Sequence, residues 1–338
     1  MTPTATARSS RKPLSERSLS TKRIVVIGGG TGSFTILSGL KRYPPHLTAV
    51  VTMTDSGGSS GRLRDEFGIL PPGDLRQCLL ALTPDDHARD TLKSLLEYRF
   101  DTGNGLTGHS FGNLFLTVLT NLAGRMDKAV DEMGRLLGIQ GRVLPVTLTN
   151  TNLCARLKNG KTVVGEAHLD IRTVDPDVPI DYVYLQQKAK VLPETARAIE
   201  EADIVVIGPG DLYTSIVPNL LVSGVPQAIQ RSRAKTLYVC SLMTKHGETD
   251  GFKASDYIKE IQRYLGNHGT LDSVLVNTAQ MPKSAITRYA GEKAHPVAFD
   301  RAACEGLVSQ VIGRTLLTEG KFVRHDQAAL AQAVIELL

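Results

Sequence analysis

Short apolar runs alternate with amphipathic stretches along the chain from residue 23 onward. Residues 23–28 (RIVVIG) predict a short buried strand, residues 33–42 (SFTILSGLKR) have the periodicity of an amphipathic helix, and residues 47–55 (LTAVVTMTD) predict a second strand. A strand, a helix and a strand in this order form a βαβ unit, in which the two strands are parallel. The pattern therefore predicts a parallel sheet at the start of the folded part.

The pattern changes to helices between about residues 62 and 140. Apolar residues recur at helical spacing from Ala129 to Leu137, and Gly138 ends that helix, while residues 114–122 are apolar enough for a helix buried on most sides. Further strands are predicted at 142–149, 181–185, 203–207, 236–242 and 272–277, a hairpin at 153–166 around Asn159-Gly160, and helices near Pro193, at 257–265 and from about Asp326.

This order predicts one Rossmann-like α/β domain over residues 23–338, with a doubly wound, mainly parallel sheet and a helical insertion at about 62–140. The chain has 338 residues, of which 41% are hydrophobic and 22% charged, as in globular proteins with a sizeable core. No apolar run reaches the roughly 18 to 20 residues that span a bilayer, so we expect no membrane span.

The formal net charge of +5 belongs to the N-terminus. Residues 1–23 hold six basic side chains and one acidic one, and the remaining 315 residues hold 33 of each sign. Because the chain after residue 23 has no formal net charge, its composition gives no reason to predict nucleic-acid binding. The six basic residues are Arg8, Arg11, Lys12, Arg17, Lys22 and Arg23.

Residues 1–22 are predicted to be a disordered basic tail, because they contain Pro3, Pro13 and almost no large apolar residue. They lack the apolar centre of a signal peptide. The two interpretations of this segment are a solvated tail and an organellar transit peptide. The four cysteines are far apart, without a C-x-x-C pair, which predicts reduced thiols in a cytoplasmic protein.

A glycine cluster follows the first predicted strand and precedes a helix. Gly28, Gly29, Gly30, Thr31 and Gly32 would let a ligand approach the backbone, and the helix start attracts anions. Ser33 stands where a dinucleotide fingerprint beginning at Gly28 needs glycine, and the lysine of a phosphate-binding P-loop is missing. Glycines that only permit a tight turn are the alternative.

A second polar loop, residues 54–64 (TDSGGSSGRLR), follows the second predicted strand and should face the first. Asp55 would accept hydrogen bonds from a ribose, and Arg62 or Arg64 would supply positive charge. The alternative is a flexible surface loop. The residues expected to form an anion-binding nest are Gly57, Gly58, Ser59 and Ser60.

Two further motifs, residues 71–76 (PPGDLR) and 108–114 (GHSFGNL), flank the helical insertion. Asp74 either contacts the ligand or forms an ion pair with Arg76. His109 and Asn113 either contact a sugar or nucleotide, with His109 as an acid or base, or are structural. Ser110 is a candidate ligand contact or a helix N-cap.

A second glycine loop at residues 207–221 (IGPGDLYTSIVPNLL) follows a predicted strand and precedes a helix, as the first loop does. Gly208 and Gly210 follow a strand, and Tyr213, Thr214 and Ser215 offer backbone and hydroxyl donors at the next helix start. A tight turn is again the alternative. Residues 241–252 add a charged loop after another strand. These loops predict a site for a nucleotide or another diphosphate-bearing small molecule, without an identifiable nucleophile or metal constellation.

These motifs, in this order, resemble the gluconeogenesis factor (YvcK-type) family, which is related to the 2-phospho-lactate transferases (CofD-type). The resemblance covers about residues 23–280. It implies a cytoplasmic Rossmann-like protein that binds UDP-sugars, notably UDP-N-acetylglucosamine, and supports gluconeogenic growth, cell shape and wall-precursor supply. On matching positions, the residues 28–32 loop, Asp55, His109, Asn113 and the residues 208–215 loop would line the site.

Three positions differ from the family pattern: Ser56 replaces an acidic residue or Asn, and Gln77 and Ser241 each replace Asn. Loss of an acid at position 56 weakens the case for metal-assisted transfer.

The first hypothesis is a non-catalytic regulator that binds a nucleotide sugar and acts on a protein partner in central carbon or amino-sugar metabolism, as a homo-oligomer. The second is a phospholactate transferase acting on a deazaflavin-type acceptor, with Asp55 or His109 as base and Arg62 at the diphosphate. A nicotinamide-dependent oxidoreductase is the third, so NAD(P) and a divalent metal remain candidate cofactors.

Overall fold

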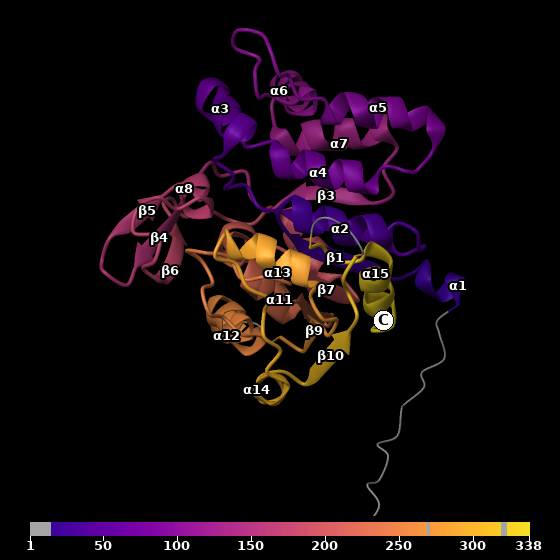
Figure 1. Ribbon diagram of the computed structural model, residues 1–338. Helices are drawn as coiled ribbons and strands as arrows, with labels where there is room; N and C mark the ends of the chain where they lie inside the picture. Colours follow the sequence, from indigo (N-terminus) through magenta and orange to yellow (C-terminus); the bar gives the residue numbers. More distant parts are fainter. Residues whose placement is uncertain (1–14, 269–270, 319–322) are drawn as a thin grey trace, which may run out of the picture.

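A seven-stranded parallel sheet forms the centre of the computed structural model (Figure 1). The structure describes residues 15–268, 271–318 and 323–338. The strand order is β10-β9-β8-β7-β1-β2-β3, which confirms the predicted doubly wound α/β fold. The strands are β1 (Arg23–Gly28), β2 (His46–Val51), β3 (Arg142–Pro145), β7 (Ile204–Ile207), β8 (Lys235–Val239), β9 (Ser273–Asn277) and β10 (Gln310–Arg314).

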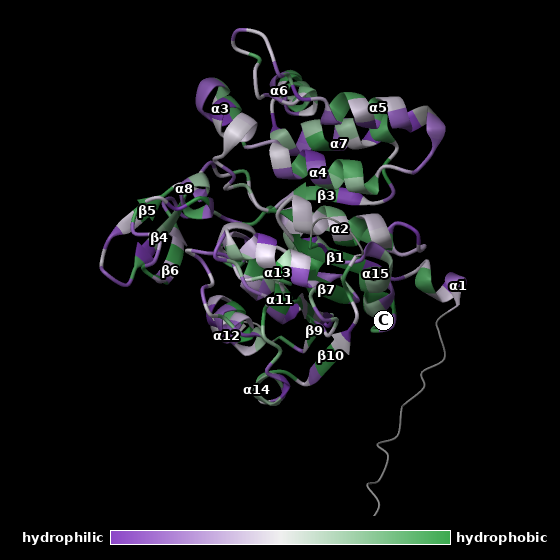
Figure 2. Cartoon of the chain, viewed as in Figure 1, coloured by the Kyte–Doolittle hydropathy of each residue, from purple (hydrophilic) through white to green (hydrophobic). Residues whose placement is uncertain are grey.

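The central strands are apolar along their length because both faces of the sheet are covered by helices. Every residue of β7 is buried, and in β1 only Arg23 is exposed. The registers Ile27↔Val50 and Ile27↔Ile207 align the carboxyl ends of β2, β1 and β7. Figure 2 shows these strands in the hydrophobic colour. The loops that follow β1, β2 and β7 therefore meet at one edge of the sheet.

Helices that connect the strands pack on the two faces. α2 (Thr31–Leu40) contacts β1, β2, α4 and α15 (Gln327–Ile335). Apart from α8 (Glu166–Asp170), which belongs to the second sheet, the helices between β3 and β10 are α9 (Pro193–Glu200), the π-helix η1 (Leu212–Ile216), α10 (Val217–Leu220), α11 (Val225–Arg231), α12 (Ala254–Leu265), the 3₁₀ helix η2 (Gly266–His268), α13 (Lys283–Ala290) and α14 (Arg301–Glu305). Among them α9 packs against α11, and α12 packs against α10 and α14.

Five consecutive helices form the predicted insertion between β2 and β3. They are α3 (Gly58–Phe67), α4 (Gly73–Leu82), α5 (His87–Glu97), α6 (Phe111–Ala123) and α7 (Met126–Leu137). Gly138 ends α7 in the left-handed conformation, as predicted. The expectation that residues 114–122 are buried on most sides is wrong, because Val118 and Leu122 are 55% and 80% exposed.

A second, three-stranded antiparallel sheet lies beside the main one (Figure 1). The predicted hairpin is β4 (Leu153–Leu157) and β5 (Thr162–Val164), and Gly160 takes the positive φ of its turn. β6 (Ile180–Leu185) pairs with the other edge of β4. A short helix, α8 (Glu166–Asp170), follows β5 and leads back toward the main sheet. This arrangement determines the position of α8, which matters for the site.

Residues 15–22, the described part of the predicted N-terminal tail, pack against the body of the protein. Residues 15–22 include the one-turn helix α1 (Glu16–Leu19), in which Leu19 is buried, and Lys22 Nζ lies 2.9 Å from Asp203 Oδ1. The prediction of disorder is therefore wrong for residues 15–22, because one apolar side chain and one ion pair attach them to the body. Residues 1–14 lie outside the described residues.

All four cysteines are buried and free. None of the described helices is long and apolar enough to cross a membrane.

Candidate functional site

The two glycine loops meet where the sheet order reverses, between β1 and β7. Ligands of doubly wound folds bind at this position, outside the carboxyl ends of the strands. A Cβ atom built on Gly32 would lie 1.8 Å from the carbonyl oxygen of Pro209, so the loops are in direct backbone contact. At Gly30 it would lie 2.5 Å from Asp74 Oδ1, and at Gly29 2.9 Å from Ser215 Oγ. Close packing thus requires these glycines, as the tight-turn interpretation says, and their anion-binding role stays a prediction.

Three carboxylates converge beside this contact. Asp55 Oδ1 accepts from the Gly57 N–H at 2.9 Å, and Ser60 Oγ accepts from the Gly73 N–H at 3.1 Å, which holds the start of α4 against the Asp55 loop. Asp74 lies in the first turn of α4. Glu166 reaches the same place from α8, where its Oε2 accepts from the Ser56 N–H at 3.3 Å. No sequence motif predicted a role for Glu166.

The positive charge near these three carboxylates is too small to balance their negative charge. Burial raises the pKa of Asp55. Burial, and then the charge of Asp55, raises the pKa of Asp74 to about 7 and that of Glu166 to about 8. Oxygen ligands with unbalanced negative charge are the donor set that Mg²⁺ prefers. Asp55, Asp74 and Glu166 carry such oxygens and influence one another's pKa, and we call them the carboxylate cluster.

Arg64, rather than Arg62, faces the carboxylate cluster. The Arg64 side chain is 11% exposed, its charge lowers the pKa of Asp55, and its buried Nη1 has no hydrogen-bond partner among the described residues. Arg62 is exposed, and its Nη2 donates to the Thr107 carbonyl at 2.7 Å. The guanidinium positioned to receive an anion is thus that of Arg64, one of the two predicted candidates.

His109 belongs to a buried hydrogen-bond network. Its Nδ1 lies 2.9 Å from Ser59 Oγ, which also accepts from Asn113 Nδ2 at 3.2 Å. Arg76 Nε donates to Asn113 Oδ1 at 2.8 Å, and among the described residues Arg76 forms no ion pair with Asp74, which was one of the two alternatives for these residues. Burial and the charge of Arg62 lower the pKa of His109. The network joins the starts of α3 and α6 to α4, as the structural interpretation of His109 requires, and a ligand contact by His109 stays a prediction.

Ser110 is the N-cap of α6, and its hydroxyl accepts from the Asn113 N–H at 3.2 Å. Tyr213 and Thr214 do not offer free donors. The Tyr213 N–H and the Thr214 hydroxyl donate to Glu248 at 3.2 Å each. The expectation that both groups face an anion is therefore wrong, because the buried Glu248 carboxylate already accepts from them.

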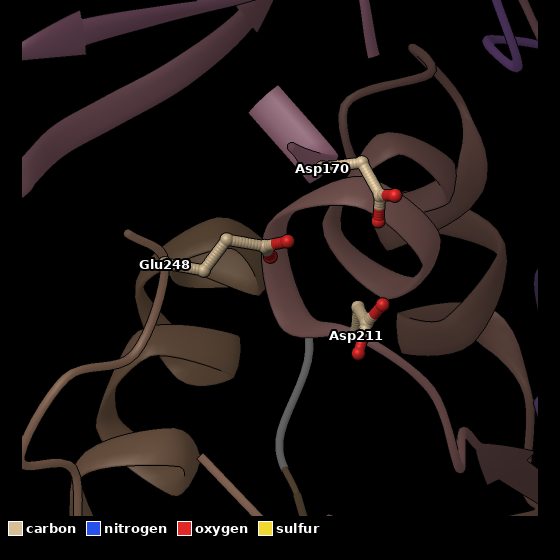
Figure 3. A group of neighbouring side chains, drawn as sticks. All are labelled: Asp170, Asp211 and Glu248. Atoms are coloured by element: carbon tan, nitrogen blue, oxygen red, sulfur yellow. The ribbon is translucent and has the colours of Figure 1, made fainter. Parts of the chain in front are cut away.

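A second acidic group surrounds Lys245. The carboxylates of Asp170, Asp211 and Glu248 point toward one another in Figure 3. Lys245 Nζ lies 2.7 Å from Asp211 Oδ2 and 3.1 Å from Glu248 Oε1, and it also pairs with Asp170. Burial alone would lower the pKa of Lys245, but the three carboxylates raise it above its usual range. The ammonium group thus supplies the positive charge that a metal ion would otherwise bring.

A cavity of about 460 Å³ runs along α2 beside the first glycine loop. Thr31, the one predicted site residue in its wall, lies at the start of α2. Ligand pockets have volumes of roughly 300 to 1,000 Å³, so a nucleotide-sized molecule fits. The other lining residues are Phe34, Thr35, Arg42, Gln77, Glu97, Thr318, Arg324, His325, Asp326, Gln327 and Ala328.

The family model described as 2-phospho-L-lactate transferase CofD matches residues 24–317. The chain belongs to the CofD family. A relative from Nostoc is 44% identical over 316 residues, which are 93% of this chain and 68% of the relative. A Bacillus subtilis protein described as a gluconeogenesis factor is 40% identical over 318 residues, covering 94% of this chain and 98% of that protein. These matches confirm the resemblance to the gluconeogenesis factors.

The crystal structure of a UPF0052 family member from Bacillus halodurans superposes with a TM-score of 0.88 at 39% identity. The match covers 93% of this chain and 99% of that one. The α/β fold is therefore shared by a solved structure over nearly its whole length.

Proposed function

We propose that this CofD-family protein binds a nucleotide sugar of the UDP-N-acetylglucosamine type in the cavity along α2. The observation that carries the proposal is that Thr31 lies in the wall of this cavity, since Thr31 belongs to the glycine loop that meets the second one at the sheet edge. Arg42 and Arg324 in its wall are suited to a diphosphate, and Gln77 and Glu97 to hydroxyl groups. The α2 N-terminus at Thr31 adds the positive end of a helix dipole.

Binding without an identifiable nucleophile favours a regulator over an enzyme. In this proposal the liganded protein acts in the cytoplasm on a protein of central carbon or amino-sugar metabolism. It thereby supports gluconeogenic growth, cell shape and wall-precursor supply. The names of the gluconeogenesis factors support only the gluconeogenic part of this proposal.

Calorimetric titration of the full chain with UDP-N-acetylglucosamine, UDP and N-acetylglucosamine tests the ligand. We expect the nucleotide sugar to bind with one site per chain and the free sugar not to bind. Absence of binding at millimolar nucleotide sugar contradicts the proposal, and tighter binding of NAD would instead favour an oxidoreductase.

A second function is favoured by the carboxylate cluster. A divalent cation held by Asp55, Asp74 and Glu166 would neutralise phosphate charge during transfer of a phospholactyl group. Arg64 would hold a phosphate oxygen beside it. Incubation with an activated phospholactate donor and a deazaflavin acceptor, followed by mass spectrometry, tests this function. A product that is lost in Asp74→Asn supports it, and absence of any product with Mg²⁺ present rejects it.

A further inference from the structure

The outer face of the second sheet is polar and aromatic. Successive side chains of a strand point to opposite faces, and the paired residues Ala155, Val163 and Val183 are buried, so they form the inner face. The outer face therefore consists of two rows of residues that pair across the three strands. These rows are Thr162, Arg156 and Tyr182, and Val164, Cys154 and Tyr184. We call these six residues the tyrosine face.

The two tyrosine rings of this face lie side by side and are open to solvent. Tyr182 and Tyr184 are 40% and 36% exposed, and their ring centroids are 5.9 Å apart with an angle of 44° between the ring planes. Val164, 43% exposed, is the one exposed aliphatic residue of the tyrosine face. Figure 1 places this sheet beside the main one, at the margin of the molecule. The face thus offers two neighbouring ring surfaces to a partner.

Positive charge without acidic partners borders the rings. Residues 150–165 contain Arg156, Lys158 and Lys161 and no acidic residue, although the chain after residue 23 is neutral as a whole. All three side chains belong to exposed residues. Lys161 pairs with Asp175 at 2.9 Å, but neither Arg156 nor Lys158 forms an ion pair with another described residue. Two cations of this hairpin are therefore available to an anionic partner.

The one acidic residue of the three strands does not interrupt the tyrosine face. Asp181 is the extra residue at a register shift of β6 against β4, so it belongs to neither row. Its backbone carbonyl accepts from Arg263 Nη1 at 2.7 Å. This bond brings a third guanidinium or ammonium group to the edge of the face that β6 forms.

Ring surfaces together with unpaired cations favour one class of partner. The bases of a single strand stack on aromatic side chains, while Arg and Lys contact the phosphates between them. A neutral glycan would use the rings but not the cations, and a protein would find one exposed aliphatic residue. The bases of a duplex are already stacked on one another. We propose that the tyrosine face binds single-stranded nucleic acid, with bases on the two tyrosines and phosphates at Arg156 and Lys158.

Fluorescence anisotropy of the full chain with a labelled oligoadenylate RNA of about 12 nucleotides tests the proposal. We expect the wild type to bind at low salt, and Tyr182→Ala and Tyr184→Ala each to bind about tenfold more weakly, since each loses one stacked base. Tyr182→Phe retains the ring and should bind like the wild type. Tyr98→Ala is the matched control, because Tyr98 is 53% exposed but lies at the end of α5. Unfolding curves check that each variant is folded.

The salt dependence of binding separates phosphate contacts from stacking. Arg156→Gln should weaken binding and lower the slope of log affinity against log salt by about 0.7. Arg135→Gln should change neither quantity, because the Arg135 side chain is 72% exposed on α7. An excess of UDP-N-acetylglucosamine keeps the RNA out of the cavity along α2, whose wall contains none of residues 153–185. The result is therefore independent of the proposed function.

Three comparison ligands define the outcomes that overturn the proposal. They are heparin, a neutral dextran and a duplex of the same RNA, all of which should bind more weakly than the single strand. Absence of RNA binding at low salt overturns the proposal, and so does unchanged affinity in both alanine variants. Heparin or duplex binding as tight as that of the single strand would show attraction to any polyanion. Dextran binding that the alanine variants lose would assign the rings to a glycan, and each of these results also overturns the proposal.

Discussion

The Ser56 N–H donates a hydrogen bond to Glu166 Oε2 at 3.3 Å, although the two residues are 110 positions apart. The Ser56 hydroxyl also accepts from the Ala167 N–H at 3.0 Å, so the start of α8 is attached to this loop at two points. Glu166, at the start of α8, thus brings a carboxylate beside position 56, where the family resemblance leads us to expect an acidic residue or Asn.

The carboxylate cluster predicts a pH-dependent effect of Mg²⁺ on stability. When folding raises the pKa of an acid, the folded protein becomes less stable as the pH increases from the unfolded pKa of that acid through its folded pKa. For Asp74, that window runs from about 4 to about 7. In EDTA, the free energy of unfolding of the wild type should fall by about 2 kcal/mol relative to Asp74→Asn between pH 5 and pH 8.

At pH 8, millimolar Mg²⁺ should raise the midpoint of thermal unfolding of the wild type but not of Asp74→Asn. Asp65→Asn is the control, because the Asp65 side chain is 72% exposed. An equal Mg²⁺ effect in the wild type and in Asp74→Asn would show that the cation binds elsewhere.

His325 predicts a second pH dependence, with the opposite sign. Burial lowers its pKa to about 4, and its Nε2 lies 3.2 Å from the Cys240 carbonyl oxygen. Since the unfolded histidine binds a proton near pH 6.5, stability is retained above that pH and falls by up to about 3 kcal/mol as the pH drops to 4. His325→Gln should remove this loss in chemical unfolding, whereas His87→Gln, at an exposed position, should retain it. The prediction is contradicted if the free energy of unfolding of both variants depends on pH as it does in the wild type.

The contact between the glycine loops predicts a stringent requirement at Gly32. A methyl group at this position meets the Pro209 backbone, which cannot move aside as a side chain can. We expect Gly32→Ala to lower the free energy of unfolding by more than about 2 kcal/mol. Gly57→Ala should change it little, because a Cβ there has only ordinary contacts, at 3.5 Å or more. Urea unfolding of the two variants decides, and equal stability would mean that the loops separate readily.

The N-terminal segment predicts a difference between two truncations. Removal of residues 1–22 deletes the buried Leu19 and the Lys22–Asp203 ion pair, and should lower the free energy of unfolding by about 2 kcal/mol. Removal of residues 1–14 should leave stability unchanged. Both truncations should keep the affinity for the nucleotide sugar, since none of residues 15–22 lines the cavity. A loss of affinity on removal of residues 1–14 would assign the basic tail to the ligand.

The features that the sequence predicted best depend on residues that lie close together along the chain. Continuous apolar runs such as residues 23–28 mark strands covered on both faces, and glycine loops directly after them lie at one sheet edge because parallel strands share their direction. Asn159-Gly160 marks a hairpin because glycine accepts the positive φ of the turn. Capping by Ser110 also follows from residues within one helical turn.

Long-range relationships could not be read in the same way. Glu166 joins Asp55 through the packing of a second sheet, and no motif near residue 166 signals it. Glu248 accepts from Tyr213 and Thr214 across more than thirty residues. The choice of Arg64 over Arg62 depends on how α3 is rotated against its neighbours. An apolar α6 was expected to be buried because hydropathy does not show on which side other elements lie.

The most direct test locates the nucleotide sugar in the cavity along α2. UDP-N-acetylglucosamine is titrated into the wild type, into the double variant Arg42→Ala/Arg324→Ala, and into Arg301→Ala, whose arginine pairs with Glu305 on the surface. We expect the double variant to bind at least tenfold more weakly, since each charged contact contributes roughly 1.5 to 3 kcal/mol, and the control to bind like the wild type. Unchanged affinity in a folded double variant would contradict the account.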